Sequence, residues 1–439
     1  MKLRLNPIIA GKKIPVSSYE SLSLQDAIEL EIGICPLAVI QSYFDELKPS
    51  SIDSMTIIKE LSYVFQQWTE PDNPYVKQAI ELLPSTTGFS TEMIRVTLKD
   101  TFEKLLQEDL SIHPIRPQIT LGQSRSVTHI LAGNVYVSGL FGIIYGILAG
   151  VPQIIKPSSH EPLFPYLFVQ SIIEYSPQLA DRLSVIYWHG GDESYENIVS
   201  QNTDKVVAYG DDESIAQISA HLLKPDALLG FGHQFSFSVI AKESLLPETI
   251  NDLAYQTAID FSMYDQQGCM SPLLIWVQAD GNVSPAEFAV KLSEQMQRIH
   301  EQIPRGKISL PESAQIRELR AHYQLKSYSL QNIRVYSSTP GTDWTVIYTN
   351  EPGIQFSCLN RVALVKPFVT FPDVLSVMLP FAGKIQVLGH SVLSDESLSQ
   401  LKEWAFVLEI NKLCAIGQMQ FPLLSDRHPG KPNPDDFRL

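Results

Sequence analysis

The sequence predicts an α/β protein organised around a doubly wound parallel sheet. From about residue 119, short apolar segments alternate with segments of helical period, the order that yields parallel strands with helices on both faces. Apolar residues make up 44% of the 439 residues, so the chain can bury a sizeable core in two or three domains. Two strand segments end at Lys156 and just before Gly210, and such sheets bind ligands at the carboxyl ends of their strands.

The region before this alternation is expected to be mostly helical. The stretch SLQD, residues 23–26, has the pattern of a helix N-terminus and precedes an apolar-periodic run. Residues 94–106 form a second run of helical period. We therefore expect residues 1–115 to form a helical layer packed on the main body, without chemistry of its own.

Strands and helices can be placed one by one across the first half of the alternating region. Each predicted strand is an apolar run closed by glycine, proline or a charged residue, and each predicted helix has an apolar face. The predicted strands are 127–132, 152–156, 184–188 and 205–209, and the predicted helices are 139–150 and 193–201.

The second half continues in the same manner. Apolar residues at steps of three and four predict a helix over 250–263, followed by a loop, a strand at 272–277 and an amphipathic helix at 285–298. Short strands are expected at WTVIY, RVALVKPF and KIQVLGH, then a helix at 396–409 and a loop-rich tail from Gly417.

One apolar stretch allows a membrane interpretation. Residues 127–155 carry no formal charge, and Gly142, Gly146 and Gly150 follow the four-residue step of membrane helix dimers. Glycine and proline interrupt the stretch, however, and its continuous helical part covers about 12 residues, short of the ~20 that span a bilayer. The sequence favours a buried helix between two buried strands and no transmembrane segment.

The net charge limits the kinds of partner that the protein can bind, and the N-terminal residues indicate its cellular compartment. A net charge of −15 argues against nucleic acid or an anionic membrane surface as the main partner, although a local basic site for a phosphorylated cofactor is compatible with it. The basic N-terminus lacks a long apolar core and a small-residue cleavage site, so we expect no signal peptide and a cytoplasmic protein.

The four cysteines are far apart in the sequence. No CxxC pair exists, so we expect neither a zinc site, nor any other metal site, nor a disulfide framework. Cys35, Cys358 and Cys414 stand among apolar neighbours and are expected to be structural.

Cys269 is the candidate for chemistry. It stands in DQQGCMSP, residues 265–272, between a predicted helix and a predicted strand. A thiol is a poor nucleophile until it loses its proton, and a loop that presents it to backbone N–H groups lowers its pKa. Gly268 leaves room for a substrate, but isolated cysteines are more often small buried hydrophobes. The loop alone leaves both interpretations open.

Four segments of the chain follow one another in a known order. They are AGNVYVSGLFGIIYGILAGVPQIIKPSSHEP, LSVIYWHGGDESYENIVSQNTDKVVAYGDDESI, GFGHQFSFSVI and YDQQGCMSP. Their order and spacing resemble the aldehyde dehydrogenase superfamily, and within it most closely the LuxC-type long-chain acyl-CoA reductases of bacterial luminescence. The resemblance is clear over about 115–300, weaker over 355–425 and faint before 110.

The resemblance implies an aldehyde-dehydrogenase-like fold, with a Rossmann-type cofactor domain and an α/β catalytic domain. The domains expected from it are an N-terminal helical region at 1–115, an NADP-binding domain at 116–245, a catalytic thiol domain at 246–390, and a segment at 391–439. This last segment would return to the cofactor domain or to an oligomer interface. The superfamily also implies a homo-oligomer.

The resemblance assigns catalytic roles residue by residue. Cys269 matches the nucleophile, and Asn134, 22 residues before Lys156, matches the asparagine that donates its side-chain N–H to the oxyanion. His233 is placed to approach the site as a proton donor, or is a hydrogen-bonded structural histidine. Asp265 and Gln267 border the nucleophile and are expected to shape the loop, because a nearby carboxylate would raise the thiol pKa.

Cofactor contacts are implied in the same way. Lys156 matches the lysine that contacts the adenosine ribose, Ser158 and Ser159 follow it, and Gly210 matches the glycine that lets the pyrophosphate approach the next helix. The ordinary alternatives are a turn residue for Asn134, a surface lysine for Lys156 and a turn glycine for Gly210.

Three departures from the family pattern bear on cofactor and reaction. NAD-preferring relatives carry a glutamate three residues after the lysine; Ser159 stands here, so NADP(H) is expected. Asp211 and Asp212 follow Gly210 where oxidising relatives have a serine, which puts the cofactor contacts in doubt. Gly230 falls where hydrolytic relatives carry a water-activating glutamate, so an acyl-enzyme should resist water.

These features predict a reductase that converts a fatty acyl thioester such as acyl-CoA to the fatty aldehyde with NADPH through an acyl-cysteine. The donor is acyl-CoA, another thioester, an acyl carrier or an acyl-protein synthetase. One rival is an aldehyde dehydrogenase that oxidises an aldehyde. Another is a non-catalytic partner subunit that kept the fold.

Overall fold

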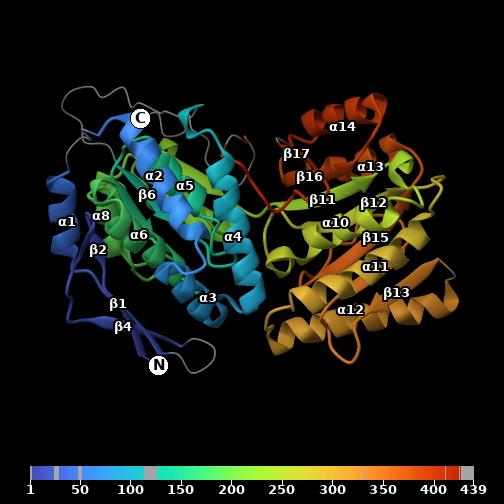
Figure 1. The fold of residues 1–439 in the computed structure, drawn as a ribbon, viewed down its shortest axis with the longest axis horizontal. Coiled ribbons are helices and arrows are strands. Elements are labelled where there is room, and N and C mark those ends of the chain that lie inside the picture. Colours follow the sequence, from blue (N-terminus) through green and yellow to red (C-terminus); the bar gives the residue numbers. More distant parts are fainter. Residues whose placement is uncertain are drawn as a thin grey trace. The chain divides into compact units, whose positions relative to one another are not determined.

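The computed structural model describes residues 2–23, 29–47, 52–112, 126–330, 332–410, 412–424 and 426, and divides the chain into two compact units. Among the described residues, unit 1 holds those up to His233 with Leu423 and Leu424, and unit 2 holds Gln234–Pro422 with Asp426. Each unit is built around its own seven-stranded sheet (Figure 1).

The sheet of unit 1 has the strand order β10-β9-β6-β7-β8-β2-β3. Its first five strands are parallel, and β2 and β3 are added antiparallel at one edge. The strands are β2 (Ile8–Ile9), β3 (Lys12–Lys13), β6 (Val127–Ile130), β7 (Gln153–Lys156), β8 (Leu183–Val185), β9 (Lys205–Tyr209) and β10 (Leu228–Phe231). The predicted doubly wound parallel sheet is thereby confirmed.

The helices of unit 1 begin mostly at residues suited to cap them. Asp53, Asn73 and Ser90 each accept a backbone N–H of the first turn, and Gly88 ends one helix in the left-handed region at φ 77°. The helices are α1 (Leu37–Asp45), α2 (Ser54–Thr69), α3 (Pro74–Thr87), α4 (Thr91–Gln107), α5 (Leu140–Leu148), α6 (Leu163–Tyr175), α7 (Pro177–Ala180), α8 (Glu193–Asn202) and α9 (Asp212–His221).

The first 33 residues correct one prediction. They were expected to be helical, but the described part forms strands, three of them in a separate sheet of order β1-β5-β4: β1 (Lys2–Leu5), β5 (Glu29–Gly33) and β4 (Tyr19–Ser23). Pairing along the chain explains this, because β5 lies between β1 and β4 and only Glu29 of its five residues is exposed. Residues 24–28, where the predicted helix would begin, lie outside the described residues.

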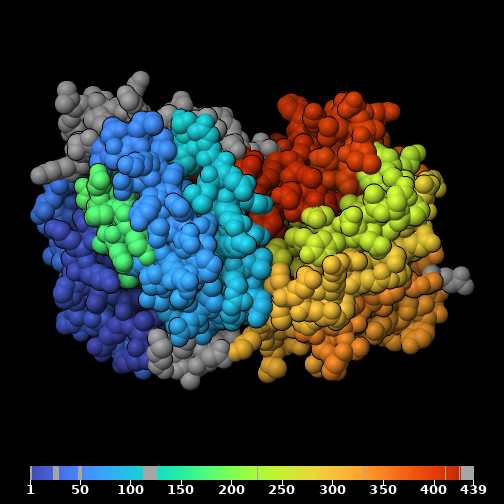
Figure 2. All heavy atoms as spheres, in the orientation of Figure 1, coloured from blue at the N-terminus to red at the C-terminus, as the bar shows by residue number. Residues whose placement is uncertain are grey.

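The later part of the N-terminal region is helical as predicted. Helices α2 to α4 supply much of the blue and cyan surface that unit 1 shows in Figure 2. Trp68 on α2 stacks on Phe102 on α4 at 4.9 Å between ring centroids, and its indole N–H donates to Ser171 on α6 at 2.8 Å. These buried contacts attach the helices to the rest of unit 1.

The apolar stretch at residues 127–155, for which a membrane interpretation was considered, includes the buried helix α5. All nine residues of α5 are buried. Within the described ranges, no helix combines the length and apolar character that a membrane crossing requires.

Unit 2 has a second sheet of order β13-β14-β15-β12-β11-β16-β17. Only β13 runs antiparallel to its neighbour. The strands are β11 (Phe235–Ile240), β12 (Pro272–Gln278), β13 (Ile333–Ser337), β14 (Thr345–Thr349), β15 (Val362–Phe368), β16 (Ile385–Ser391) and β17 (Lys412–Ala415). The three strands predicted after Asp343 correspond to β14, β15 and β16.

The helices of unit 2 are α10 (Ile250–Ser262), α11 (Pro285–Gln302), α12 (Leu310–Ser329), α13 (Phe371–Met378) and α14 (Asp395–Val407). Capping boxes begin α11 and α12, where Ser284 pairs with Glu287 and Ser309 with Glu312. Of these, α12 and α13 were not predicted. In α12 only Ile316 and Tyr323 of the 20 residues are buried, so its apolar period is weak.

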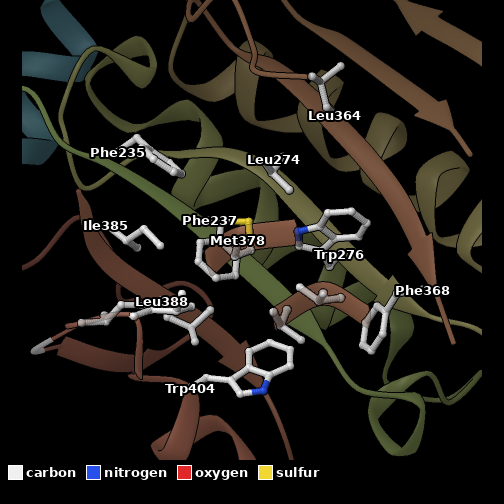
Figure 3. Packing of buried hydrophobic residues seen from close by; sticks show 14 of the residues in the cluster. Phe235, Phe237, Leu274, Trp276, Leu364, Phe368, Met378, Ile385, Leu388 and Trp404 are labelled. Atoms are coloured by element: carbon white, nitrogen blue, oxygen red, sulfur yellow. The ribbon is translucent and has the colours of Figure 1, made fainter. Parts of the chain in front are cut away.

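Two apolar clusters pack the two faces of this sheet. Alternate residues of each strand enter opposite clusters: Leu274 and Trp276 face one, Ile275 and Val277 the other. Figure 3 shows the first cluster, in which Phe235, Ile385 and Trp404 lie with residues of β12 and β15. The second contains the apolar face of α10, the helix that leads to Cys269.

Several boundaries differ from those predicted. Strand β8 ends at Val185 rather than at residue 188, and α6, α9, β10 and β17 were not predicted. The two units meet in sequence between His233 and Gln234, before the expected boundary at 245, and residues 391–422 belong to unit 2. The roles assigned to the expected domains stay predictions.

Candidate active site

Cys269 lies exposed on a tight turn at the amino end of β12. Ser271 donates its backbone N–H to the carbonyl of Gly268 at 2.9 Å, which closes a four-residue turn around the cysteine. Just before it, Tyr264, Asp265 and Gln266 have φ of 51°, 49° and 65°. Three consecutive side chains in the left-handed region are costly, so other contacts must hold this backbone.

A buried ion pair supplies the first of these contacts. Arg361 donates its Nε–H to Asp265 at 2.7 Å, and neither side chain has more than 5% of its surface exposed. The second carboxylate oxygen of Asp265 accepts the backbone N–H of Gly306 at 2.8 Å, and Arg361 also donates to the carbonyl of Ile303 at 2.8 Å. Asp265 therefore shapes the loop, as predicted, through a partner 96 residues away.

Arg361 belongs to a second left-handed run, Leu359, Asn360 and Arg361, with φ of 64°, 56° and 63°. Gln266 joins the two runs, because it donates to the carbonyl of Val362 at 3.0 Å and accepts the Val362 N–H at 2.9 Å. Gln267 adds a bond to Asn360 at 3.0 Å. The two left-handed runs are thus joined directly by Asp265 and Arg361, and through the neighbouring residues Val362 and Gln267, on the side of the loop that precedes the nucleophile.

The backbone of Cys269 is fixed from β11 and β16. Ser236 donates its hydroxyl to the Cys269 carbonyl at 2.8 Å and accepts the backbone N–H of Val387 at 3.1 Å. The ladder shifts register between Ser236 and Ser238 on one side, and between Phe235 and Phe237 on the other. Ser236 stays opposite Pro272 on β12 but has no register partner on β16, where its hydroxyl accepts the Val387 N–H instead.

Opposing influences set the pKa of the Cys269 thiol. Desolvation by the surrounding protein raises the pKa to about 11, although the residue itself is exposed. The side chain of Gln386 on β16 and the backbone N–H groups of Cys269 and Met270 act in the opposite direction and lower it.

Cys269, Ser236 and Gln386 lie near the amino ends of three adjacent parallel strands, β12, β11 and β16. The other three cysteines have no such setting. Cys35 is fully buried with its pKa raised to about 11 by desolvation, and Cys358 and Cys414 are half-buried.

The candidate residues of unit 1 gather at the opposite end of their strands. Asn134 follows β6, Lys156 ends β7 and Gly210 follows β9, and these three strands are adjacent and parallel. Lys156 and Gly210 lie at the carboxyl ends of their strands, as predicted, and Asn134 follows the strand between these two. Their roles are not tested by this arrangement.

Lys156 carries its ammonium 5.7 Å from the ring centre of Trp188. Desolvation lowers its pKa, and the carboxylates of Glu196 and Glu20 partly oppose this. A half-desolvated cation at a strand end is suited to a polar or anionic ligand group.

The loop after β7 packs against the loop after β6. A Cβ at Gly133 would lie 2.7 Å from Ser158 Oγ and from His160 Cβ, so glycine is needed for this approach. Ser159 is exposed. Glu161, two residues later, is 2% exposed and accepts the N–H groups of Leu163 and Phe164 at the start of α6, so its carboxylate turns into the protein. No carboxylate among the described residues 157–160 competes with an anion at this loop.

The acidic pair after Gly210 has definite partners. Asp211 caps α9 by accepting the N–H of Ser214 at 2.7 Å, which holds its pKa below the usual range, and Asp212 accepts the backbone N–H of His233 at 2.9 Å. A Cβ at Gly210 would lie 3.1 Å from Ser214 Cβ, so the glycine serves close packing of β9 on α9. The Lys156 end fits the adenosine half of a dinucleotide, whereas the capped α9 terminus does not fit its pyrophosphate.

His233 and Gly230 lie at the end of unit 1. His233 is exposed, and its backbone N–H donates to Asp212; this bond tests neither of the two roles predicted for its side chain. A Cβ at Gly230 would lie 2.7 Å from Ile215 Cγ2, so a larger residue there requires movement.

Comparison with known proteins gives a consistent result. Residues 50–433 match the family described as Acyl-CoA reductase (LuxC). The long-chain acyl-protein thioester reductase of Vibrio harveyi is 24% identical over 385 residues, covering 83% of this chain and 74% of that protein. That of Photorhabdus laumondii subsp. laumondii is 32% identical over 306 residues, covering 69% and 60%.

Solved structures agree on the fold. Aldehyde dehydrogenase 21 from Physcomitrella patens superposes with a TM-score of 0.75 at 11% identity, covering 100% of this chain and 97% of that one. An NADP-dependent enzyme of E. coli gives 0.73 at 14% identity, covering 99% and 96%. The fold is that of the aldehyde dehydrogenases, and the chain belongs to the acyl-CoA reductase (LuxC) family.

Proposed function

We propose that the protein reduces a fatty acyl thioester to the fatty aldehyde with NADPH, through an acyl-cysteine on Cys269. One observation carries the proposal: in a chain of this family, an exposed cysteine is held by its backbone carbonyl on a turn fixed by buried contacts. A spectator cysteine needs no such support.

In the first half-reaction, the thiol of Cys269 loses its proton and the sulfur attacks the thioester carbonyl. The carbonyl π electrons move to oxygen, where the backbone N–H of Cys269 and the side chain of Asn134 are the proposed donors. Collapse breaks the bond to the carrier sulfur. The carrier thiolate leaves and takes up a proton, and the acyl group stays on Cys269.

In the second half-reaction, the acyl carbon of the acyl-cysteine would take up a hydride, which a nicotinamide cofactor held near Lys156 would supply. The carbonyl of the acyl-cysteine becomes a thiohemiacetal, which collapses with cleavage of the carbon–sulfur bond. The aldehyde leaves and the Cys269 sulfur is restored. One thioester, one hydride and one proton give one aldehyde and one thiol.

The glycine at position 230, where hydrolytic relatives carry a water-activating glutamate, supports reduction of the acyl-cysteine over its hydrolysis. Gly230 carries no side chain, and Ile215 fills the space that a Cβ there would need. Without a positioned base, water attacks an acyl-cysteine slowly.

NADPH is proposed over NADH because of the loop after β7. Ser159 is exposed and uncharged, and the carboxylate of Glu161 is committed to α6. No negative side chain at that loop would oppose a 2′-phosphate near Lys156. Ser158, packed on Gly133, shapes the same loop.

Steady-state turnover tests the proposal. Tetradecanoyl-CoA with NADPH should yield one tetradecanal for each NADPH consumed, and Asn134→Ala should lower kcat by about 100-fold, as loss of an oxyanion donor does. Oxidation of tetradecanal to the acid without CoA, and no reduction of any thioester, would favour the dehydrogenase instead. If the protein reduces an acyl group only when a carrier or synthetase protein delivers it, that protein is the acyl donor.

A further inference from the structure

Three phenylalanine rings contact one another in unit 2. Phe235, Phe356 and Phe381 have ring centroids 4.8–5.5 Å apart, and each pair meets edge to face. Phe235 is 6% exposed and belongs to the apolar cluster of Figure 3, whereas Phe356 is 38% exposed. These three rings, which we call the phenylalanine triad, therefore lead from the protein surface to the core of the unit.

Phe235 connects the triad to the nucleophile. It is the first residue of β11, which pairs with β12, the strand that follows the turn of Cys269. Its neighbour Ser236 donates its hydroxyl to the carbonyl of Cys269 at 2.8 Å. The buried ring of the triad is thus one residue away from a direct contact with the cysteine.

Phe356 is joined to the same part of the chain through a second serine. Ser357, the next residue, donates its hydroxyl to Gln266 at 3.3 Å and its backbone N–H to the carbonyl of Leu273 at 3.3 Å. These two partners lie three residues before and four residues after Cys269. The exposed ring is therefore also held beside the turn that carries the nucleophile.

The loop that presents Phe356 is restrained by buried contacts. Lys366, which is 2% exposed within β15, donates to the carbonyl of Glu351 and to Oε1 of Gln355, both at 2.7 Å. Gln355 and Ser357, the residues on either side of Phe356, both form hydrogen bonds within the unit, while the ring between them stays exposed. A restrained exposed ring is suited to binding, because little conformational entropy is lost when a ligand covers it.

The segments that carry the two outer rings are uncharged. Residues 352–360 and 374–383 contain no Asp, Glu, Lys or Arg, although these residues make up 18% of the chain. Leu379, in the second segment, is 49% exposed. Exposed apolar patches mark binding sites. A patch without charge fits a hydrocarbon ligand rather than the phosphates of a cofactor.

We infer that the phenylalanine triad binds the fatty acyl chain of the substrate, and that Phe356 and Phe381 set the preference for long chains. The acyl group is that of the proposed function, so this assignment rests on it. An acyl group on Cys269 is tethered there, and its methylene groups are stabilised by an apolar surface that begins at the same turn. A long chain covers the outer rings, whereas a short one ends before them.

The chain-length preference in turnover tests the inference. With NADPH, Phe356→Ala should lower kcat/KM for tetradecanoyl-CoA about tenfold, which corresponds to about two buried methylene groups, and change that for butanoyl-CoA less than about twofold. The ratio of the two values isolates the acyl chain, because both substrates share the CoA part and the chemistry. Phe381→Ala should shift the ratio in the same direction.

Phe406→Ala is the matched control, because Phe406 is 86% exposed in the same unit and lies outside the triad. It should leave both kcat/KM values unchanged. An unchanged ratio in Phe356→Ala, or an equal fall for both substrates, would overturn the inference, since the rings would then serve another partner or the fold. If Phe356→Ala fails to fold, Phe381→Ala decides by the same criterion.

Binding of unreactive thioethers separates this inference from the proposed function. S-tetradecyl-CoA and S-butyl-CoA have no carbonyl that Cys269 could attack. Calorimetry, below the concentration at which the long thioether forms micelles, should show tighter binding of the tetradecyl compound, and Phe356→Ala should reduce that preference about tenfold. Equal preference in the parent chain and the variant would refute the inference. If the parent chain reduces no thioester, the proposed function fails, while these dissociation constants still decide whether the triad binds the chain.

Discussion

The two seven-stranded sheets carry their candidate residues at opposite ends of their strands. In unit 1, Asn134, Lys156 and Gly210 follow the carboxyl ends of β6, β7 and β9. In unit 2, Cys269 and Ser236 lie at the amino ends of β12 and β11. The carboxyl end is where ligands of parallel sheets usually bind, so unit 1 follows a general rule and unit 2 needs special construction.

The two sites also differ in how deeply the residues that build them are buried. The loop of Cys269 depends on a buried ion pair, two left-handed runs and a bridging hydroxyl. The residues of unit 1 are half-buried or exposed and stand at the ends of regular strands. We expect changes around Cys269 to affect stability and chemistry together, and changes at Lys156 and Ser159 in unit 1 to affect cofactor binding without loss of stability.

The largest effect is expected for Cys269→Ser, which should lower thioester reduction at least about thousandfold. A hydroxyl without a positioned base is a far weaker nucleophile than a thiolate. The rate of NADPH oxidation with tetradecanoyl-CoA measures it. Cys358→Ser is the control and should retain most activity; a Cys269→Ser rate above a tenth of the parent would contradict the assignment.

Breaking the ion pair should come next. Arg361→Met leaves Asp265 as an uncompensated buried charge, and we expect the free energy of unfolding to fall by about 3–5 kcal/mol. Urea denaturation of the full chain measures this. Adding Asp265→Asn should recover part of the loss, because the buried charge is removed. A loss below about 1 kcal/mol would mean that the loop does not depend on the pair.

Lys156→Met should weaken cofactor binding and leave stability unchanged, the reverse of the Arg361→Met result. We expect the KM for NADPH to rise about tenfold, as when one charged contact worth about 1.4 kcal/mol is lost. Stability and alkylation of Cys269 should stay unchanged, because the substitution removes a partly desolvated charge at a strand end. A fall in stability as large as that expected for Arg361→Met would contradict the claim that the Lys156 site, unlike the Cys269 loop, serves binding without contributing to stability.

The smallest effect is expected at Ser159. Ser159→Glu places a carboxylate near a 2′-phosphate, and about 1 kcal/mol of repulsion at 4 Å in water predicts a fivefold lower preference for NADPH over NADH. The ratio of kcat/KM values for the two cofactors measures it, with Ser159→Ala as control. An unchanged ratio would show that this loop does not face the 2′ position.

Elements whose apolar residues follow a regular period along the chain could be predicted from the sequence. Strands β6, β7 and β9 and helices α5, α10 and α11 follow from apolar period and from glycine and proline boundaries. The N-terminal strands were missed because they are two to five residues long and carry alternate charges, as in KLRL and ELEIG. Such short strands depend on partners far along the chain.

The nucleophile was found from its loop, but its supports were not. Asp265 and Arg361 are 96 residues apart and Ser236 and Val387 are 151 apart, and no local pattern joins them. Desolvation, which raises the thiol pKa of Cys269, also depends on the packed structure and could not be predicted from the loop.

The most direct test of the central claim is the intact mass of the protein after mixing with tetradecanoyl-CoA in the absence of NADPH. The account predicts one added acyl group, on the peptide that contains Cys269, and its release as tetradecanal when NADPH is added. An unmodified Cys269 with an acyl group on another cysteine, or release as the free acid when NADPH is present, would contradict it.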